Sequence, residues 1–135
     1  MASLYEIRAG IRRRASAVSG LRVHGSVPDR LNPPAAFVGA PDRVDFDLAF
    51  QRASDRWTIP LRIAVSRATD RAAQAALDAY LAGSGAASLK AALEDPEGDG
   101  DVIDTLRVTE VRAYGVFEHA GVQYLGAELV LDIIA

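Results

Sequence analysis

The sequence predicts an α+β domain, with an antiparallel or mixed sheet of about five or six strands and its helices packed mainly on one face. Three observations predict it. Apolar residues follow helical periodicity at the N-terminus and again in the middle of the chain, two long stretches alternate with a period of two, and the elements come in the order helix, strands, hairpin, two helices, hairpin. With 135 residues, of which 50% are hydrophobic, residues 1–135 are expected to form a single domain.

The first helix is predicted to begin after Ser3. Ser3 and Glu6 have the Ser-x-x-Glu spacing of a capping box, in which the side chain of each residue bonds the backbone N–H of the other. From Leu4 to Val18, apolar residues recur at steps of three and four and form one stripe along the helix. Gly20 is expected to end the helix, because glycine readily adopts the conformation of a C-terminal cap.

Short strands and a loop are predicted next. Residues 21–24 alternate briefly like a strand. The prolines within residues 28–34 favour a loop, because proline lacks a backbone donor and restricts the residue before it. Residues 35–40 are typical of a short strand, either buried or at an edge, which Pro41 ends.

The strongest alternation in the chain predicts a long antiparallel hairpin. Its first strand covers residues 44–50 and its second strand covers residues 57–65. Pro60 falls among the solvent-facing positions of the second strand, so its missing N–H indicates an edge strand or a bulge. The apolar positions of the first strand, which are expected to face the core, are Val44, Phe46, Leu48 and Phe50.

The same hairpin carries opposite charges on its two strands. Asp45 and Asp47 alternate with the apolar residues of the first strand, whereas Arg56 and Arg62 belong to the second. We expect cross-strand ion pairs between these acids and arginines. Because exposed ion pairs contribute only about 0–1 kcal/mol, such pairs would set register and surface charge more than stability.

Two helices and a second hairpin complete the predicted fold. Asp70 is the expected N-cap of a helix that ends at Gly83, and a shorter helix is expected over residues 86–93. Residues 105–117 and 121–134 are predicted to form the final two strands, joined by a tight polar turn.

Charge and composition argue against several classes of function. The net charge of −3 is too small to indicate nucleic acid or an anionic membrane as a partner. The sequence has no cysteine, and its two histidines lie far apart, so thiolate chemistry is excluded and metal or cofactor chemistry has few ligands. No apolar run approaches the ~20 residues that span a bilayer. No catalytic constellation stands out, and we expect neither an enzyme nor a cofactor.

Two charged segments allow a binding interpretation. Residues 94–104 contain six acids and no base, but their spacing departs from the EF-hand pattern of a calcium loop, so a solvated loop or an acidic lip that meets a basic neighbour is favoured. The run Arg12-Arg13-Arg14 fans over about 200° of a helix, so its side chains cannot all face one phosphate backbone. A solvated face is favoured there, a subunit interface comes second and a DNA contact third.

Over nearly its whole length, the chain resembles the tail terminator (tail completion) proteins of long-tailed bacteriophages that infect high-GC actinobacteria. The resemblance is carried by the opening SLYEIRAGI, by LRVHGSVPDRLNPPAAFVG, by VDFDLAF and DRWTIPLRIAVSRATDRAAQAALDAYLAGSG, and by the closing TLRVTEVRAYGVFEHAGVQYLGAELVLDIIA. It implies a hexameric ring that caps the tail tube, stops tube polymerisation and offers a surface to head-completion or connector proteins. The implied location is the neck of the virion, after assembly in the host cytoplasm, with DNA passing through the ring lumen.

A ring subunit needs complementary surfaces on neighbouring copies. Our hypothesis for that interface joins basic residues of one copy to acidic residues of the next, and its members are Arg12, Arg13, Asp45, Asp47, Arg56, Arg62, Glu97, Asp99 and Asp101.

Two alternative functions stay open at this point. One is another neck component, such as a head-tail connector or head-completion protein. The other is a small ligand-binding domain, which would need a concave cleft with converging polar groups. The residues that would line such a cleft are Trp57, Tyr80, Tyr114 and Tyr124.

Overall fold

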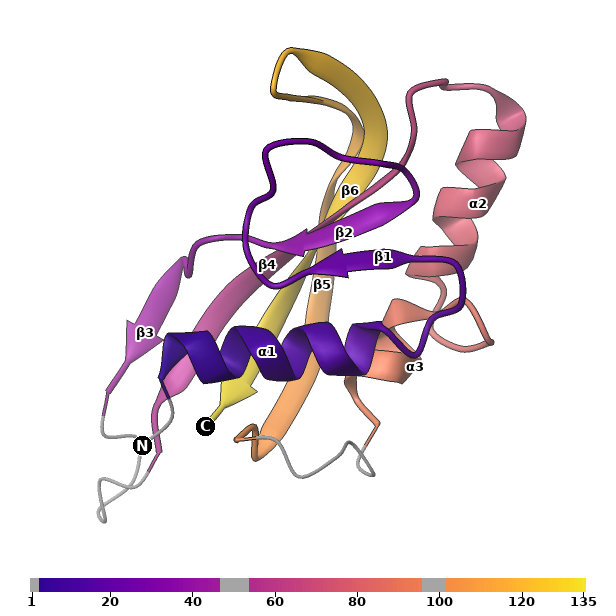
Figure 1. The fold of residues 1–135 in the computed structure, drawn as a ribbon. Coiled ribbons are helices and arrows are strands. Elements are labelled where there is room, and N and C mark those ends of the chain that lie inside the picture. Colours follow the sequence, from indigo (N-terminus) through magenta and orange to yellow (C-terminus); the bar gives the residue numbers. More distant parts are fainter. Residues whose placement is uncertain (1–2, 47–53, 96–101) are drawn as a thin grey trace.

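Strands from separate parts of the chain form one mixed sheet. The computed structural model describes residues 3–46, 54–95 and 102–135, and within them six strands lie in the order β1-β2-β4-β6-β5, with β3 pairing β4 next to β2 (Figure 1). β1 is parallel to β2, and the other described pairs are antiparallel. The predicted α+β class is confirmed. The strands are β1 (Arg22–His24), β2 (Ala35–Val38), β3 (Arg43–Asp45), β4 (Arg56–Ser66), β5 (Thr105–His119) and β6 (Val122–Ile134).

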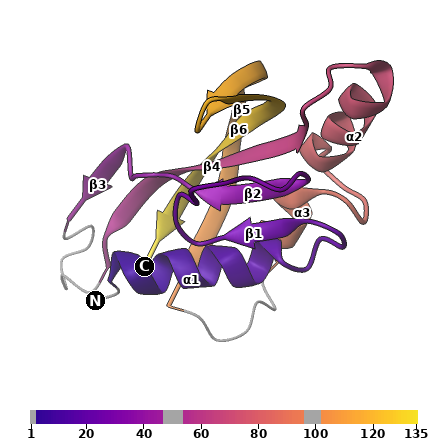
Figure 2. The same ribbon diagram turned by 45° about the horizontal axis from the view of Figure 1, so that its top comes forward.

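The helices of the described chain pack on one face of this sheet (Figures 1 and 2). They are α1 (Leu4–Ala15), α2 (Arg71–Leu81) and α3 (Leu89–Leu93), and all of them bury side chains in one apolar core. That core takes the odd-numbered residues 57–65 of β4 and 125–133 of β6. Because side chains alternate between the two faces of a strand, the even-numbered residues of β4 and β6 lie on the opposite face, here called the open face. None of the helices in the described ranges has the length and apolar character needed to cross a membrane.

Side-chain caps start the first two helices at the expected positions. The Ser3 hydroxyl accepts a hydrogen bond from the Glu6 backbone N–H at 3.2 Å and donates to the Glu6 carboxylate at 3.1 Å. The Asp70 carboxylate accepts from the Ala73 N–H at 2.9 Å. Each cap satisfies a donor that the first turn of a helix leaves unpaired.

Two helix boundaries differ from the prediction. α1 ends at Ala15 rather than at Gly20, because the Ser16 hydroxyl donates to the Arg12 carbonyl at 2.6 Å and the chain then turns while Val18 stays buried. α3 begins at Leu89 rather than near residue 86, because Ser88 is its N-cap. In both cases a serine side chain competes for backbone groups at the helix end.

Pro60 lies in a central strand, so its prediction as an edge or bulge residue was wrong. On one side of β4, pairs with β6 run along the whole of β4. On the other side, the pairs with β2 end at Leu61 and the pairs with β3 begin at Thr58. The Pro60 carbonyl accepts from the Gly39 N–H at 2.9 Å. The missing N–H therefore faces the junction between β2 and β3, where no ladder bond is lost.

The predicted first hairpin is confirmed over a short stretch. Val44 pairs with Trp57 across β3 and β4, and Val44 packs against the core. Phe46 was expected to face the core, but it is 67% exposed because β3 ends at Asp45 and the alternation no longer applies beyond it. Leu48 and Phe50 lie outside the described residues.

The final hairpin extends beyond its predicted first strand, since β5 continues to His119. Ala120 and Gly121 connect β5 to β6, and both have positive φ angles, of 52° and 81°. Such two-residue turns match the twist of the strands they join. β5 also shifts register twice against β6, after Val108 and after Arg112, and next to the second shift Ala113 has a φ of 55°. β5 is thus an edge strand with bulges in the described sheet.

Candidate interaction surfaces

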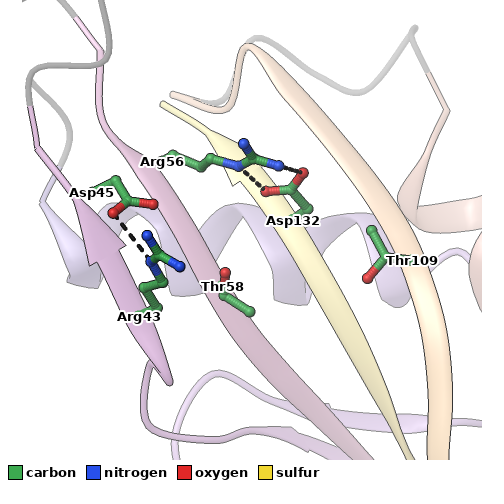
Figure 3. Close-up of a pocket in the computed structure, with 6 residues that line it drawn as sticks. All are labelled: Arg43, Asp45, Arg56, Thr58, Thr109 and Asp132. Carbon is green, nitrogen blue, oxygen red and sulfur yellow. Dashed lines mark hydrogen bonds and ion pairs between the residues drawn. The ribbon is translucent and has the colours of Figure 1, made fainter.

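Charged side chains on the open face bind one another within the chain. Arg56 of β4 donates to both carboxylate oxygens of Asp132 on β6, each at 2.8 Å (Figure 3). Asp45 lies directly opposite Arg56 in the β3–β4 register, yet its carboxylate accepts from Arg43 at 3.1 Å. The expected cross-strand pair between Asp45 and Arg56 is therefore replaced by two other pairs.

A second ion-pair network connects β4, β6 and β5. Arg62 bonds Glu128 at 2.5 Å and lies over the Phe117 ring, with its guanidinium carbon 4.4 Å from the ring centroid. Arg112 bonds the other oxygen of Glu128 at 2.6 Å and also bonds Asp42 at 2.8 Å. Arg62 thus has an acidic partner in its own chain, and the expected pair with Asp45 does not form.

These pairs shift the pKa values of their members. The hydrogen bond and the charge of Arg56 lower the pKa of Asp132 below its ordinary value, against the effect of burial. Hydrogen bonds to Asp132 and to Glu128 raise the pKa of Arg56 and of Arg112, respectively. The charged forms of Asp132, Arg56 and Arg112 are therefore favoured. An acid of a neighbouring copy would have to displace Asp132 from Arg56 or Glu128 from Arg112.

Sequence reasoning missed the two acids that complete these networks, Glu128 and Asp132. A signal was present, because both occupy even positions in the apolar alternation of 125–133 and so face away from the core. What the sequence did not reveal was the order of the strands in the sheet. Only when β6 is known to lie beside β4 does Glu128 fall opposite Arg62, and Asp132 diagonally across from Arg56.

The aromatic residues of the alternative ligand cleft do not meet. Trp57 belongs to the core under the helices and Tyr80 packs against it, whereas Tyr124 is buried on the open face. Tyr114 is exposed and donates from its hydroxyl to Asp78 at 2.9 Å. This cleft is therefore not formed.

Shallow depressions on the open face have polar linings. One of about 290 Å³ is lined by the Arg43–Asp45 and Arg56–Asp132 pairs together with Thr58 and Thr109 (Figure 3). Another, of about 430 Å³, lies beside the β5–β6 turn and includes Arg30, Arg67 and His119. The His119 ring nitrogen Nε2 is 2.7 Å from the Pro28 carbonyl oxygen. Within residues 3–46, 54–95 and 102–135, no three acidic or histidine side chains are placed to hold a metal ion.

The arginine run of α1 divides between the core edge and the surface. Arg14 donates to the carbonyls of Leu93 at 3.0 Å and of Ile103 at 3.5 Å, so it joins α1 to the end of α3 and to the start of the final hairpin. Arg12 and Arg13 are exposed. The interface residues Asp47, Glu97, Asp99 and Asp101 lie outside the described residues.

Arg12 contributes to a groove of about 370 Å³ along α1. Tyr5 is 83% exposed at this groove, and Arg8 and Arg12 are the charged residues that line it. We call this surface the α1 groove, and its residues are Leu4, Tyr5, Arg8, Ala9, Arg12, Gly25 and Ser26.

A second exposed apolar surface lies on β5. Val111 and Val116 of β5 pair with Leu129 and Leu125 of β6, which face the helices. Because paired residues share one face of a sheet, the two valines lie on the same side of the sheet as the helices. Val116 is 53% exposed, and Tyr114 reaches α2 through its bond to Asp78. We call Val111, Tyr114, Val116 and Asp78 the β5 patch.

No protein-family model matches the chain, and no curated protein matches it.

Proposed function

We propose that the chain is a structural virion protein of a long-tailed bacteriophage, which forms a ring on the end of the tail tube. The ring would stop tube polymerisation and offer a surface to the head-completion or connector protein in the neck. The source of this hypothesis is the resemblance to tail terminator proteins along nearly the whole sequence. The proposed action is binding, without a catalytic step.

One observation carries the proposal. Exposed apolar side chains occur on two unlike surfaces from different elements of the fold, with Tyr5 at the α1 groove and Val111, Tyr114 and Val116 at the β5 patch. Contiguous exposed apolar surface on a small protein usually marks an interaction site. A subunit in a closed ring needs two unlike surfaces, one for each neighbour. A single pocket with converging polar groups would instead favour a ligand-binding domain.

The open face supports a role as a stiff scaffold. Its described arginines on β4 are bound to acids of β6, which ties the two central strands together through side chains as well as through the backbone ladder. A rigid subunit loses little conformational entropy when it enters an assembly. Rigidity of this kind favours a ring whose shape must match the end of a tube.

A ring would terminate the tube through the number of its contacts. Each subunit needs only a weak bond to the tube, because the first bond holds the others at high effective concentration. The ring would then cover the surface to which the next tube subunit adds. Tube growth would stop without any covalent change.

Light scattering coupled to size-exclusion chromatography tests the proposal. We expect a ring mass for the protein alone or after mixing with the tail-tube protein of the same phage, with a tube protein from an unrelated phage as the control. Assembly should persist at high salt, since apolar contacts are not screened as exposed charges are. A chain that stays monomeric and ignores the matching tube protein would contradict the proposal.

A further inference from the structure

The α1 groove and the β5 patch carry opposite charges. Arg8 and Arg12 provide the formal charges among the residues that line the groove. The β5 patch includes Asp78, and Glu118 follows Val116 by two positions on the same side of β5. Two positive groups on one surface thus correspond to two negative groups on the other.

The acid of the β5 patch is available to a cation. The Asp78 carboxylate accepts a hydrogen bond from the hydroxyl of Tyr114, a neutral donor, at 2.9 Å. This bond raises the pKa of Tyr114 and keeps its hydroxyl beside the acid. Asp78 is itself exposed. An arginine from outside the chain could therefore bond Asp78 without breaking an ion pair.

In the described residues, no ion pair joins the α1 groove to the β5 patch within one copy. The beginning of α1 and helix α2 lie at opposite sides of the molecule in both views (Figures 1 and 2). A contact that covers both surfaces would therefore join two molecules. Contact between two unlike surfaces repeats from copy to copy and closes into a ring when the rotation allows it.

We propose that the β5 patch of one copy docks on the α1 groove of the next, with Asp78 of the first copy bonded to Arg12 of the second. The exposed Val111, Tyr114 and Val116 pack against Tyr5 and Ala9 in this arrangement. This inference rests on the proposed function, because it names the contact through which the ring closes. Of the basic partners in our sequence-based interface, which were Arg12, Arg13, Arg56 and Arg62, this contact keeps Arg12.

Charge reversal tests the contact in solution. Arg12→Glu and Asp78→Arg each place like charges across the interface, and we expect each variant alone to weaken assembly by about tenfold or more in dissociation constant. An equimolar mixture should restore assembly, because an alternating ring then contains the native pair and the reversed pair in turn. Sedimentation velocity measures the assembly of Arg12→Glu, of Asp78→Arg, of their mixture and of the wild type.

Matched controls exclude general effects of charge and of misfolding. Arg30→Glu and Asp29→Arg make the same changes on exposed residues of the loop before β2, outside both surfaces, and should assemble like the wild type. Circular dichroism melting curves should show that all four variants fold.

The possible failures are distinguishable. If Arg12→Glu and Asp78→Arg assemble as well as the wild type, the proposed contact is wrong but the proposed ring is not contradicted. If both variants form rings yet lose binding to the tube protein, the two surfaces dock the tube and the contact between copies is overturned. If the mixture stays dissociated, the pairing of Arg12 with Asp78 is overturned. A wild type that never assembles, with or without tube protein, contradicts the proposed function as well.

Discussion

The open face and the two apolar surfaces expose different chemistry. On the open face, Arg56, Arg62 and Arg112 each hold an acidic partner of the same chain. At the α1 groove and the β5 patch, apolar side chains are exposed, and Asp78 is bonded to a neutral phenol, the hydroxyl of Tyr114. The number of charged side chains on a surface therefore does not by itself select the surface that we propose as the interface. Charges that are already paired stiffen the sheet, whereas exposed apolar groups still have surface to bury.

The largest expected effect on stability comes from a substitution at Gly126, on the open face. An added Cβ at Gly126 would lie 1.9 Å from the Ile63 carbonyl oxygen and 2.7 Å from a ring carbon of Phe117. Gly126→Ala must therefore push β4 away from β6 and also displace the Phe117 ring, and we expect a loss of about 3 kcal/mol in the free energy of unfolding. Urea denaturation measures it.

Gly83→Ala is the matched control for this change. An added Cβ at Gly83 meets no atom within 4 Å, and the residue precedes α3 in an exposed segment. We expect a change within about 0.5 kcal/mol. Equal losses at the two glycines would contradict the close approach of β4 and of the Phe117 ring to Gly126.

A smaller effect tests the ion pairs through their pH dependence. The pKa of Asp132 is lowered in the folded chain. The stabilising contribution of Asp132 is therefore complete above its unfolded pKa of about 4 and is lost as the pH falls through the folded pKa. Asp132→Asn should lower Tm by a few degrees at pH 7 and progressively less below pH ~4.

Thermal melts of Asp132→Asn and wild type at a series of pH values check this sign. The difference between their Tm values must shrink on acidification. A difference that is constant or that grows towards low pH would mean that the pairing of Arg56 with Asp132 does not stabilise the folded chain.

The smallest effect concerns the strand that carries the β5 patch. Ala113 has a φ of 55°, a conformation that costs an L-residue with a Cβ and suits glycine. Ala113→Gly should stabilise the chain by about 0.5 to 1 kcal/mol. By contrast, Ala75→Gly on the exposed side of α2 should destabilise it by about 1 kcal/mol. A loss at both positions would contradict the strained bulge beside Tyr114.

The sequence contains most of the local structure, because capping and alternation depend on near neighbours. Ser3 and Asp70 cap helices as their spacing predicts, and the alternation of residues 57–65 places the same side chains in the core that it predicts. The helix ends were less predictable, since Ser16 and Ser88 compete for backbone groups in ways that a periodic pattern does not reveal.

The sequence does not contain the order of the strands, and the misplaced residues follow from that gap. Pro60 was assigned to an edge strand or a bulge because nothing local shows that β6 lies along β4. Arg56 and Arg62 were assigned to a neighbouring copy for the same reason, since their partners Asp132 and Glu128 come from the far end of the chain. Long-range pairing of this kind is decided by packing of the whole sheet rather than by any short window.

We propose that the chain caps a tail tube by binding to copies of itself and to the tube. Electron microscopy of phage particles produced without this protein tests it most directly. The account predicts tails that are overlong or not joined to heads, with both defects corrected when the wild-type chain is supplied. Particles with tails of normal length, joined normally to heads, would contradict it.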